Sequence, residues 1–147
     1  MITKYLLLAI FGIAMAHFEG VVVLYLRRAL GILNRVPNRD FLEKIPKDYI
    51  LIEKTREAAT IVMLVALALL VGTSLIDMII VFLWTFAFWD LFYYLSLYIL
   101  IKWPSSLNTI DVLFLIPRPW IAPVWFPIGV STLTIVGIII LLALGVV

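Results

Sequence analysis

The sequence predicts an all-α protein: a polytopic four-helix bundle in a membrane, with a proline-rich interfacial or re-entrant segment before the last helix. Hydrophobic residues make up 65% of the 147 residues and charged residues only 14%, whereas a soluble domain is about half apolar and a quarter charged. Four apolar runs of roughly 20 residues, the length that crosses a hydrocarbon core as a helix, occupy most of the chain. We therefore expect a single transmembrane domain, residues 1–147.

The expected helices are separated by polar or proline-rich segments. They cover residues 2–26, 50–72, 76–101 and 128–147. Residues 27–49 are polar and basic and include Pro37 and Pro46, which favours a loop with short helical pieces at the membrane surface. Residues 103–127 contain five prolines, which no single regular helix accommodates, so we expect a broken segment there.

The basic residues predict the orientation of the bundle. Eight of the eleven Lys and Arg residues lie between positions 27 and 56. Connections rich in Lys and Arg stay in the cytoplasm. We therefore expect the 27–49 loop in the cytoplasm and both termini outside.

Ionisable groups inside apolar helices cost on the order of 2.5–3.5 kcal/mol each, so each needs a partner, a water-filled cavity or a function. Glu19 lies seven residues before the end of the first expected helix, and Glu57 seven residues after the second begins. Asp90 lies in the cytoplasmic half of the third. Three helices thus bring carboxylates to similar depths, which predicts that they lie close together.

Helical phase identifies further members of this polar group. Glu53, Arg56, Glu57 and Thr60 fall on one stripe of the second helix. Tyr93 and Tyr94 lie one turn from Asp90. On the first helix, Gly12 and Ala16 form a small-residue face suited to close packing. On an ideal helix the His17 side chain points about 200° away from that of Glu19. It therefore either bends around the helix toward the polar group or contacts another part of the protein.

The charge count favours a bound metal. The four carboxylates exceed Arg56 and a protonated His17 by two negative charges. Oxygen ligands with an imidazole suit iron or manganese, which would serve redox or lipid-related chemistry. The hypothesis assigns as metal ligands Glu19, Glu53, Glu57, Asp90 and His17. The supporting polar network comprises Arg56, Thr60, Tyr93, Tyr94 and Asp111.

Two other interpretations remain open. In the first, Arg56 neutralises Glu53 or Glu57 and a tyrosine binds Asp90, so that the charges only fix helix packing in an accessory subunit of a larger membrane complex. In the second, the cluster transfers protons or ions. The residues do not decide whether the protein is an enzyme.

The remaining features concern the membrane surface and partners. Six residues are expected at the lipid interface: Arg27, Arg28, Trp103, Arg118, Trp120 and Trp125. Membrane lipids are the expected partners, together with a membrane protein or a second copy of the chain. The sequence has no cysteine, which excludes a cysteine-ligated cofactor. It has no nucleic-acid signature either.

Two motifs resemble an uncharacterised family of small prokaryotic membrane proteins with four helices. The first includes Trp89, Asp90, Tyr93 and Tyr94, and the second runs from Asp111 to Trp120 with the pattern DxLFLIPxPW. The resemblance implies an integral protein of the prokaryotic cytoplasmic membrane. It implies no activity.

Overall fold

The computed structural model describes residues 2–32 and 39–146, without the side chains of residues 39–41. The described chain is mostly helical, in agreement with the predicted class. Its elements are α1 (Ile2–Ala29), α2 (Arg39–Lys44), α3 (Lys47–Val71), α4 (Leu75–Ile101), β1 (Ile110–Phe114), β2 (Trp120–Pro123) and α5 (Trp125–Ala143). The four long helices match the four predicted ones, and α2 is a helical piece in the expected 27–49 loop. Residues 33–38 of that loop lie outside the described part.

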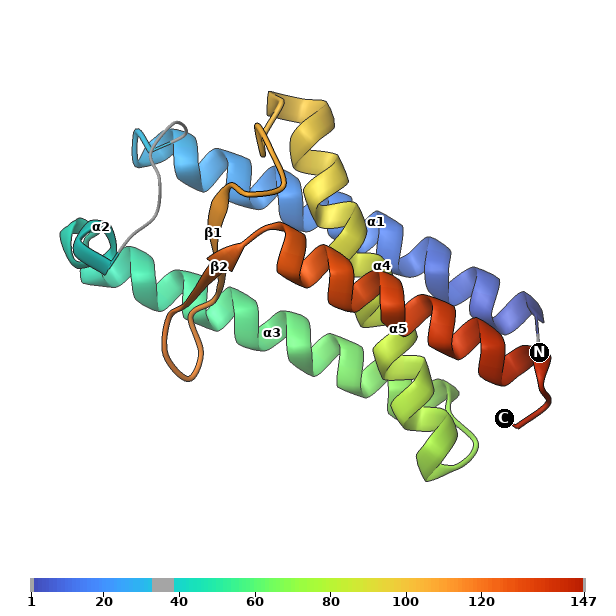
Figure 1. Ribbon diagram of the computed structural model, residues 1–147. Helices are drawn as coiled ribbons and strands as arrows, with labels where there is room; N and C mark the ends of the chain where they lie inside the picture. Colours follow the sequence, from blue (N-terminus) through green and yellow to red (C-terminus); the bar gives the residue numbers. More distant parts are fainter. Residues whose placement is uncertain (1, 33–38, 147) are drawn as a thin grey trace.

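The chain runs back and forth between two ends of the molecule. The two termini lie at one end, and α2 and the connection between β1 and α5 lie at the other (Figure 1). We call the first the terminal end and the second the hairpin end. This arrangement places both termini at the end opposite α2 (Figure 1).

The central element of the fold is α4, on which α1, α3 and α5 each pack. Its most extensive contact is with α1, because glycine and alanine on α1 let the two backbones approach closely. A Cβ added at Gly12 would lie 3.0 Å from the carbonyl oxygen of Thr85, and Ala16 is fully buried. The predicted small-residue face is therefore confirmed.

The hydrophobic core lies toward the terminal end. Tyr5 and Leu8 of α1 pack there with Val81 and Trp84 of α4 and with Ile138 of α5. The indole Nε1 of Trp84 donates to the carbonyl oxygen of Tyr5 at 2.8 Å, so the large ring is buried with its polar atom paired.

An ion pair closes the terminal end. Lys4 Nζ lies 2.7 Å from both carboxylate oxygens of Asp77. The same carboxylate accepts hydrogen bonds from the Tyr5 hydroxyl and from the backbone and hydroxyl of Thr73. Asp77 thus joins α1 to the connection between α3 and α4.

Residues 103–127 contain an antiparallel hairpin that the sequence analysis did not predict. Ile110 pairs with Pro123 and Val112 with Ile121, with an irregularity after Val112. The prolines indicated correctly that no single helix spans this segment, and alternating Ile110, Val112 and Phe114 suit a short strand. The hairpin crosses α3, and its turn extends beyond that helix (Figure 1).

The helix ends differ from those predicted by a few residues. Helix α5 begins at Trp125, before Pro127, because proline is tolerated in the first turn, where its missing N–H would be unpaired anyway. It ends at Ala143, two residues before Gly145, whose φ of 65° is left-handed. Helix α3 begins at Lys47, directly after Pro46.

Candidate functional site: a charged and aromatic cavity

A cavity of about 320 Å³ lies at the hairpin end. Its walls come from the last turns of α1, from α2, from the first half of α3 and the second half of α4, from the hairpin and from the start of α5. Six acidic or basic side chains line it: Arg27, Glu53, Arg56, Glu57, Asp90 and Asp111. A second hollow, of about 400 Å³, lies beside Lys4 and Asp77 at the terminal end. The cavity at the hairpin end is the one that takes in most of the predicted site.

Arg56 is the centre of the first polar group. Its guanidinium forms an ion pair with Glu19 of α1 and another with Glu53, one turn earlier on α3, at 2.9 Å. The hydroxyl of Thr60 donates to the second oxygen of Glu19 at 2.8 Å. Glu19 and Thr60 are almost fully buried. Arg56 and Thr60 thus share one hydrogen-bonded network with Glu19 and Glu53.

Asp111 of β1 is the centre of the second group. Arg27 at the end of α1 and the hydroxyl of Tyr94 on α4 donate to its two oxygens, at 3.2 and 3.1 Å. The Arg27 guanidinium also lies 4.4 Å from the ring centre of Trp103. Burial raises the pKa of the Asp111 carboxyl, while the guanidinium and the phenol act against that rise. The base of the hairpin is thereby joined to α1 and α4.

Glu57 binds the turn of the hairpin. Its two carboxylate oxygens accept hydrogen bonds from consecutive backbone N–H groups, those of Leu115 at 2.8 Å and Ile116 at 3.0 Å. Hydrogen bonds to an ionised carboxylate are stronger than neutral ones. One side chain of α3 therefore fixes the hairpin over the cavity.

Asp90 lies on α4 among aromatic rings. Its Oδ2 accepts a hydrogen bond from the Ser131 hydroxyl of α5 at 2.7 Å. The ring centres of Phe86 and Trp89 are 5.3 Å apart, and those of Trp89 and Tyr93 are 6.3 Å apart. Trp89 Nε1 is buried with no hydrogen-bond partner among the described residues. This wall of the cavity thus combines one carboxylate with three aromatic side chains.

The side chains predicted to bind a metal have other partners in this arrangement. Within residues 2–32 and 39–146, no three His, Asp or Glu side chains are placed to hold one ion. Arg56 occupies the space between Glu19 and Glu53, Glu57 is turned toward the hairpin backbone, and Asp90 toward Ser131. His17 lies 3.4 Å from the Ser96 hydroxyl, so it makes the different contact that its helical phase allowed.

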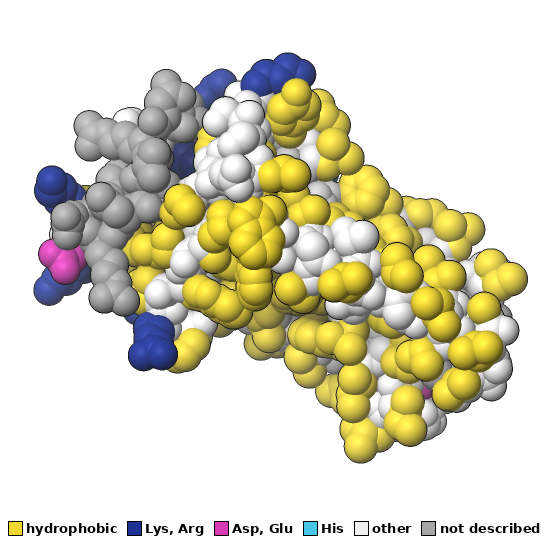
Figure 2. Space-filling view, in the orientation of Figure 1, with side chains coloured by type: hydrophobic (Ala, Val, Ile, Leu, Met, Phe, Trp, Pro, Cys, Tyr) yellow, Lys and Arg dark blue, Asp and Glu magenta, His cyan; other side chains and the backbone are white. Residues whose placement is uncertain are grey.

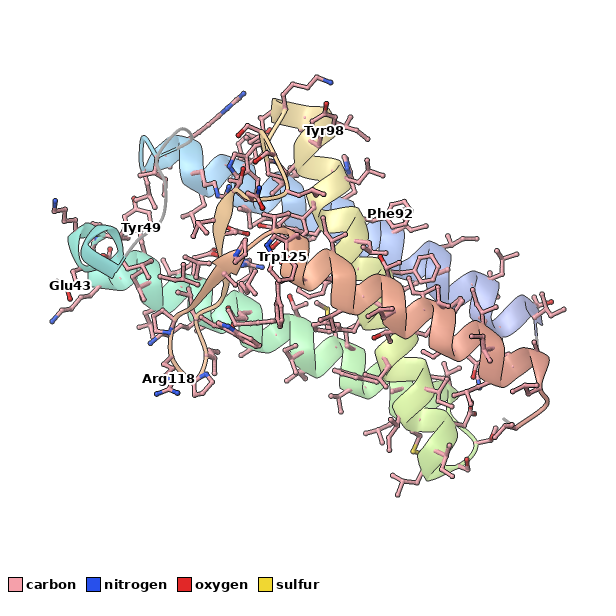
Figure 3. The ribbon with its side chains drawn as sticks, viewed as in Figure 1. Glu43, Tyr49, Phe92, Tyr98, Arg118 and Trp125 are labelled. Atoms are coloured by element: carbon pink, nitrogen blue, oxygen red, sulfur yellow. The ribbon has the colours of Figure 1, made fainter. Side chains whose placement is uncertain are left out.

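Several predicted roles change. Asp90 was expected to bind Tyr93 or Tyr94, but its partner is Ser131, and Tyr94 binds Asp111 instead. The sequence predicts Arg27, Trp103 and Trp120 at the lipid interface, whereas all three line the cavity. Exposed members of that predicted interface set are Arg28, Arg118, Trp120 and Trp125. Arg118 points away from the helices at the tip of the hairpin (Figure 3).

Sequence reasoning missed three participants. Ser131 was the first polar residue of an apolar run, which was a usable signal because a hydroxyl inside such a helix tends to bind across to a neighbour. The backbone of Leu115 and Ile116 gave no signal, because the amide of any residue can serve as a donor.

Comparisons with protein-family models, with curated proteins and with solved structures found no match. The resemblance of residues 88–120 to an uncharacterised membrane-protein family therefore stays a prediction.

Proposed function

We propose that the chain is an integral membrane protein of four spanning helices that binds a small ligand in the cavity at its hairpin end. The observation that carries the ligand site is the cavity itself: about 320 Å³, with charged and aromatic side chains facing one space in an otherwise apolar chain. This volume lies at the lower end of the range for small-molecule sites.

The membrane assignment is supported by helix length and by the outer surface. Helices α1, α4 and α5 have 28, 27 and 19 residues and are apolar enough to cross a membrane. Large apolar side chains point outward along them and along α3, for example Leu70, which is 83% exposed, and Leu133, which is 74% exposed. A soluble protein rarely exposes so much contiguous apolar surface.

The fourth spanning helix would be α3, whose first half carries charges. Its 25 residues extend about 37 Å at 1.5 Å per residue. Glu53, Arg56 and Glu57 find their partners within the protein, on α1, on α3 itself and on the hairpin. Paired in this way, they do not have to be exposed to lipid.

The hairpin end would face the cytoplasm. Figure 2 shows Lys and Arg side chains around α2 and the hairpin and over the end of α4 at the top of the view, and hydrophobic side chains over most of the remaining visible face. Lys4 is the one basic residue near the terminal end of the described chain. The positive-inside rule then orients the bundle with both termini outside.

A ligand site agrees with the geometry better than the metal site does, because the acidic side chains already bind separate partners. The accessory-subunit interpretation is favoured by one observation: both cavity-lining arginines are paired within the chain. A cavity that excludes small water-soluble reagents would support that interpretation.

Because the native chain has no cysteine, single-cysteine variants test the proposal directly. A cysteine replacing the exposed Glu43 should react with an impermeant maleimide only after the cells are permeabilised, and one replacing the exposed Val146 should react in intact cells. The reverse pattern would overturn the orientation.

Single-cysteine variants also test whether a small reagent can enter the cavity. Ser131 lines it, while the adjacent Thr132 is exposed on the outer surface of α5. In membranes, Ser131→Cys should react with methyl methanethiosulfonate and Thr132→Cys should not, because a thiol facing lipid does not form the reactive thiolate. A cysteine at position 131 that reacts only after denaturation would contradict the ligand site.

A further inference from the structure

We infer that the cavity takes a lipophilic organic cation, with its positive group against Asp90 and the aromatic side chains of α4. This inference rests on the proposed function of the cavity as a ligand site and names the chemical class of the ligand. It is based on two observations: some carboxylates of the cavity lining have no cationic partner, and aromatic side chains surround one of them.

The ionisable lining has an excess of negative charge. Four of the six groups are carboxylates and two are arginines. Arg27 is engaged by Asp111, and Arg56 by Glu53 and by Glu19, which lies outside the lining. Two carboxylates of the lining, Glu57 and Asp90, therefore have no cationic partner among the described residues.

These two carboxylates differ in what surrounds them. Both oxygens of Glu57 accept backbone hydrogen bonds, which compensate its charge. Asp90 accepts one hydrogen bond, from Ser131 to Oδ2, and its other oxygen has no donor among the described residues. A carboxylate in an apolar environment with so little compensation attracts a positive charge strongly.

The wall around Asp90 selects an organic ion over an inorganic one. Phe86, Trp89 and Tyr93 form a continuous series of rings along α4 on both sides of Asp90. Ring faces attract cations, and they do so most strongly where water is excluded. A small metal ion would need several oxygens at short range, which the described acidic side chains do not provide here.

The test compares two thiol reagents of opposite charge and similar size at the cysteine of Ser131→Cys. These are 2-(trimethylammonium)ethyl and 2-sulfonatoethyl methanethiosulfonate. The exposed cysteine of Glu43→Cys gives the reference ratio of their rates, because Glu43 points outward from α2 (Figure 3). We expect the cationic reagent to be favoured at position 131 by about tenfold or more over that reference.

Two further measurements assign the preference to the named groups. Adding Asp90→Asn to Ser131→Cys should return the ratio close to the reference, whereas adding Asp48→Asn, an exposed acid at the start of α3, should leave it unchanged. Benzyltrimethylammonium should slow the modification at position 131, and its uncharged isostere neopentylbenzene should do so at least tenfold less effectively. This comparison needs no substitution at Asp90.

The outcomes separate the inference from the proposed function. If neither reagent reaches position 131 in the folded protein, the ligand site itself is overturned. If both reagents react at the reference ratio and the two benzyl compounds protect equally, the cavity is accessible but has no preference for cations, and only the present inference is overturned.

Discussion

The two ends of the molecule use charged residues in different ways. At the terminal end, Lys4 and Asp77 form a pair whose carboxylate receives further hydrogen bonds from Tyr5 and Thr73, beside a packed apolar core. At the hairpin end, the ion pairs of Arg27 and Arg56 surround a cavity and leave Glu57 and Asp90 without a cation.

The difference shows that the presence of ion pairs does not indicate whether a region is structural or functional. Both ends contain buried or half-buried pairs between elements distant in the sequence. The distinguishing feature is what encloses the space beside them: the hollow of about 400 Å³ beside Lys4 and Asp77 is lined by only a few residues near the helix ends, whereas the cavity at the hairpin end is lined by residues of seven elements, including aromatic side chains. The predictions below test whether substitutions at the two ends also differ in their effect on stability.

The largest expected effect is at Arg56, whose loss leaves the almost fully buried Glu19 without its cation. A buried charge stripped of its partner typically costs 3–5 kcal/mol. We expect Arg56→Gln to lower the free energy of unfolding by about 3 kcal/mol. Denaturant unfolding in one detergent would measure it.

The control and the double variant define the cause. Arg118→Gln removes the same charge at the exposed hairpin tip and should change stability by less than about 0.5 kcal/mol. Combining Glu19→Gln with Arg56→Gln should recover a large part of the loss, as expected for a coupled pair. Equal effects of Arg56→Gln and Arg118→Gln would show that the hairpin-end network does not stabilise the fold.

The sequence predicted the parts of this network that depend on local geometry. The pairing of Glu53 with Arg56 follows from their spacing on one helix, and the meeting of Glu19 with Arg56 and Thr60 follows from matched depth and helical phase. The lengths and order of the four long helices followed from hydropathy.

The remaining contacts depend on which elements lie side by side, and neither the depth of a residue in the membrane nor its helical phase determines that. Matched depth predicted that Glu57 would join the other carboxylates, but it does not reveal which neighbour a helix face meets. Glu57 meets the hairpin, an element formed by residues far along the chain. Arg27 could have been assigned to lipid or to Asp111 by composition alone, and only the position of β1 decides between them.

The second prediction compares how stability changes when one CH₂ unit is added to a side chain at the terminal end and at the hairpin end. A Cβ at Gly72, in the connection between α3 and α4, would lie 2.8 Å from the Ala68 carbonyl oxygen and 2.8 Å from Met78 Cα. These are backbone atoms that cannot rotate away, so Gly72→Ala should destabilise the fold by about 2 kcal/mol. Thermal unfolding of the purified protein would measure the loss.

The matched variant is Val112→Ile, which adds the same group to a β-branched residue lining the cavity. With space beside it, the larger side chain should change stability by less than about 0.5 kcal/mol. A similar large loss in both variants would mean that the hairpin end is packed as tightly as the terminal end.

The smallest global effect is expected at Glu57, where the readout is local. Glu57→Gln keeps the size of the side chain and one acceptor oxygen but loses the charge, so one of the two hydrogen bonds to the hairpin turn is lost and the other weakens. The expected loss of overall stability is about 1 kcal/mol. Hydrogen exchange at the Leu115 and Ile116 amides should quicken at least several-fold, while the core around Val81 keeps its protection.

This last variant also decides between the two roles given to Glu57. If Glu57 only fixes the hairpin, Glu57→Gln should not alter the metal content of the protein. The control variant Glu43→Gln, on the exposed face of α2, should change neither the metal content nor the exchange rates of the Leu115 and Ile116 amides. Stoichiometric iron or manganese in the native protein that disappears in Glu57→Gln, with the amide protection intact, would instead support the metal hypothesis. Faster exchange without metal loss assigns Glu57 to the hairpin, and metal loss alone assigns it to an ion; a change in both would mean that its two oxygens, with about four lone-pair sites between them, accept the backbone hydrogen bonds and bind an ion together.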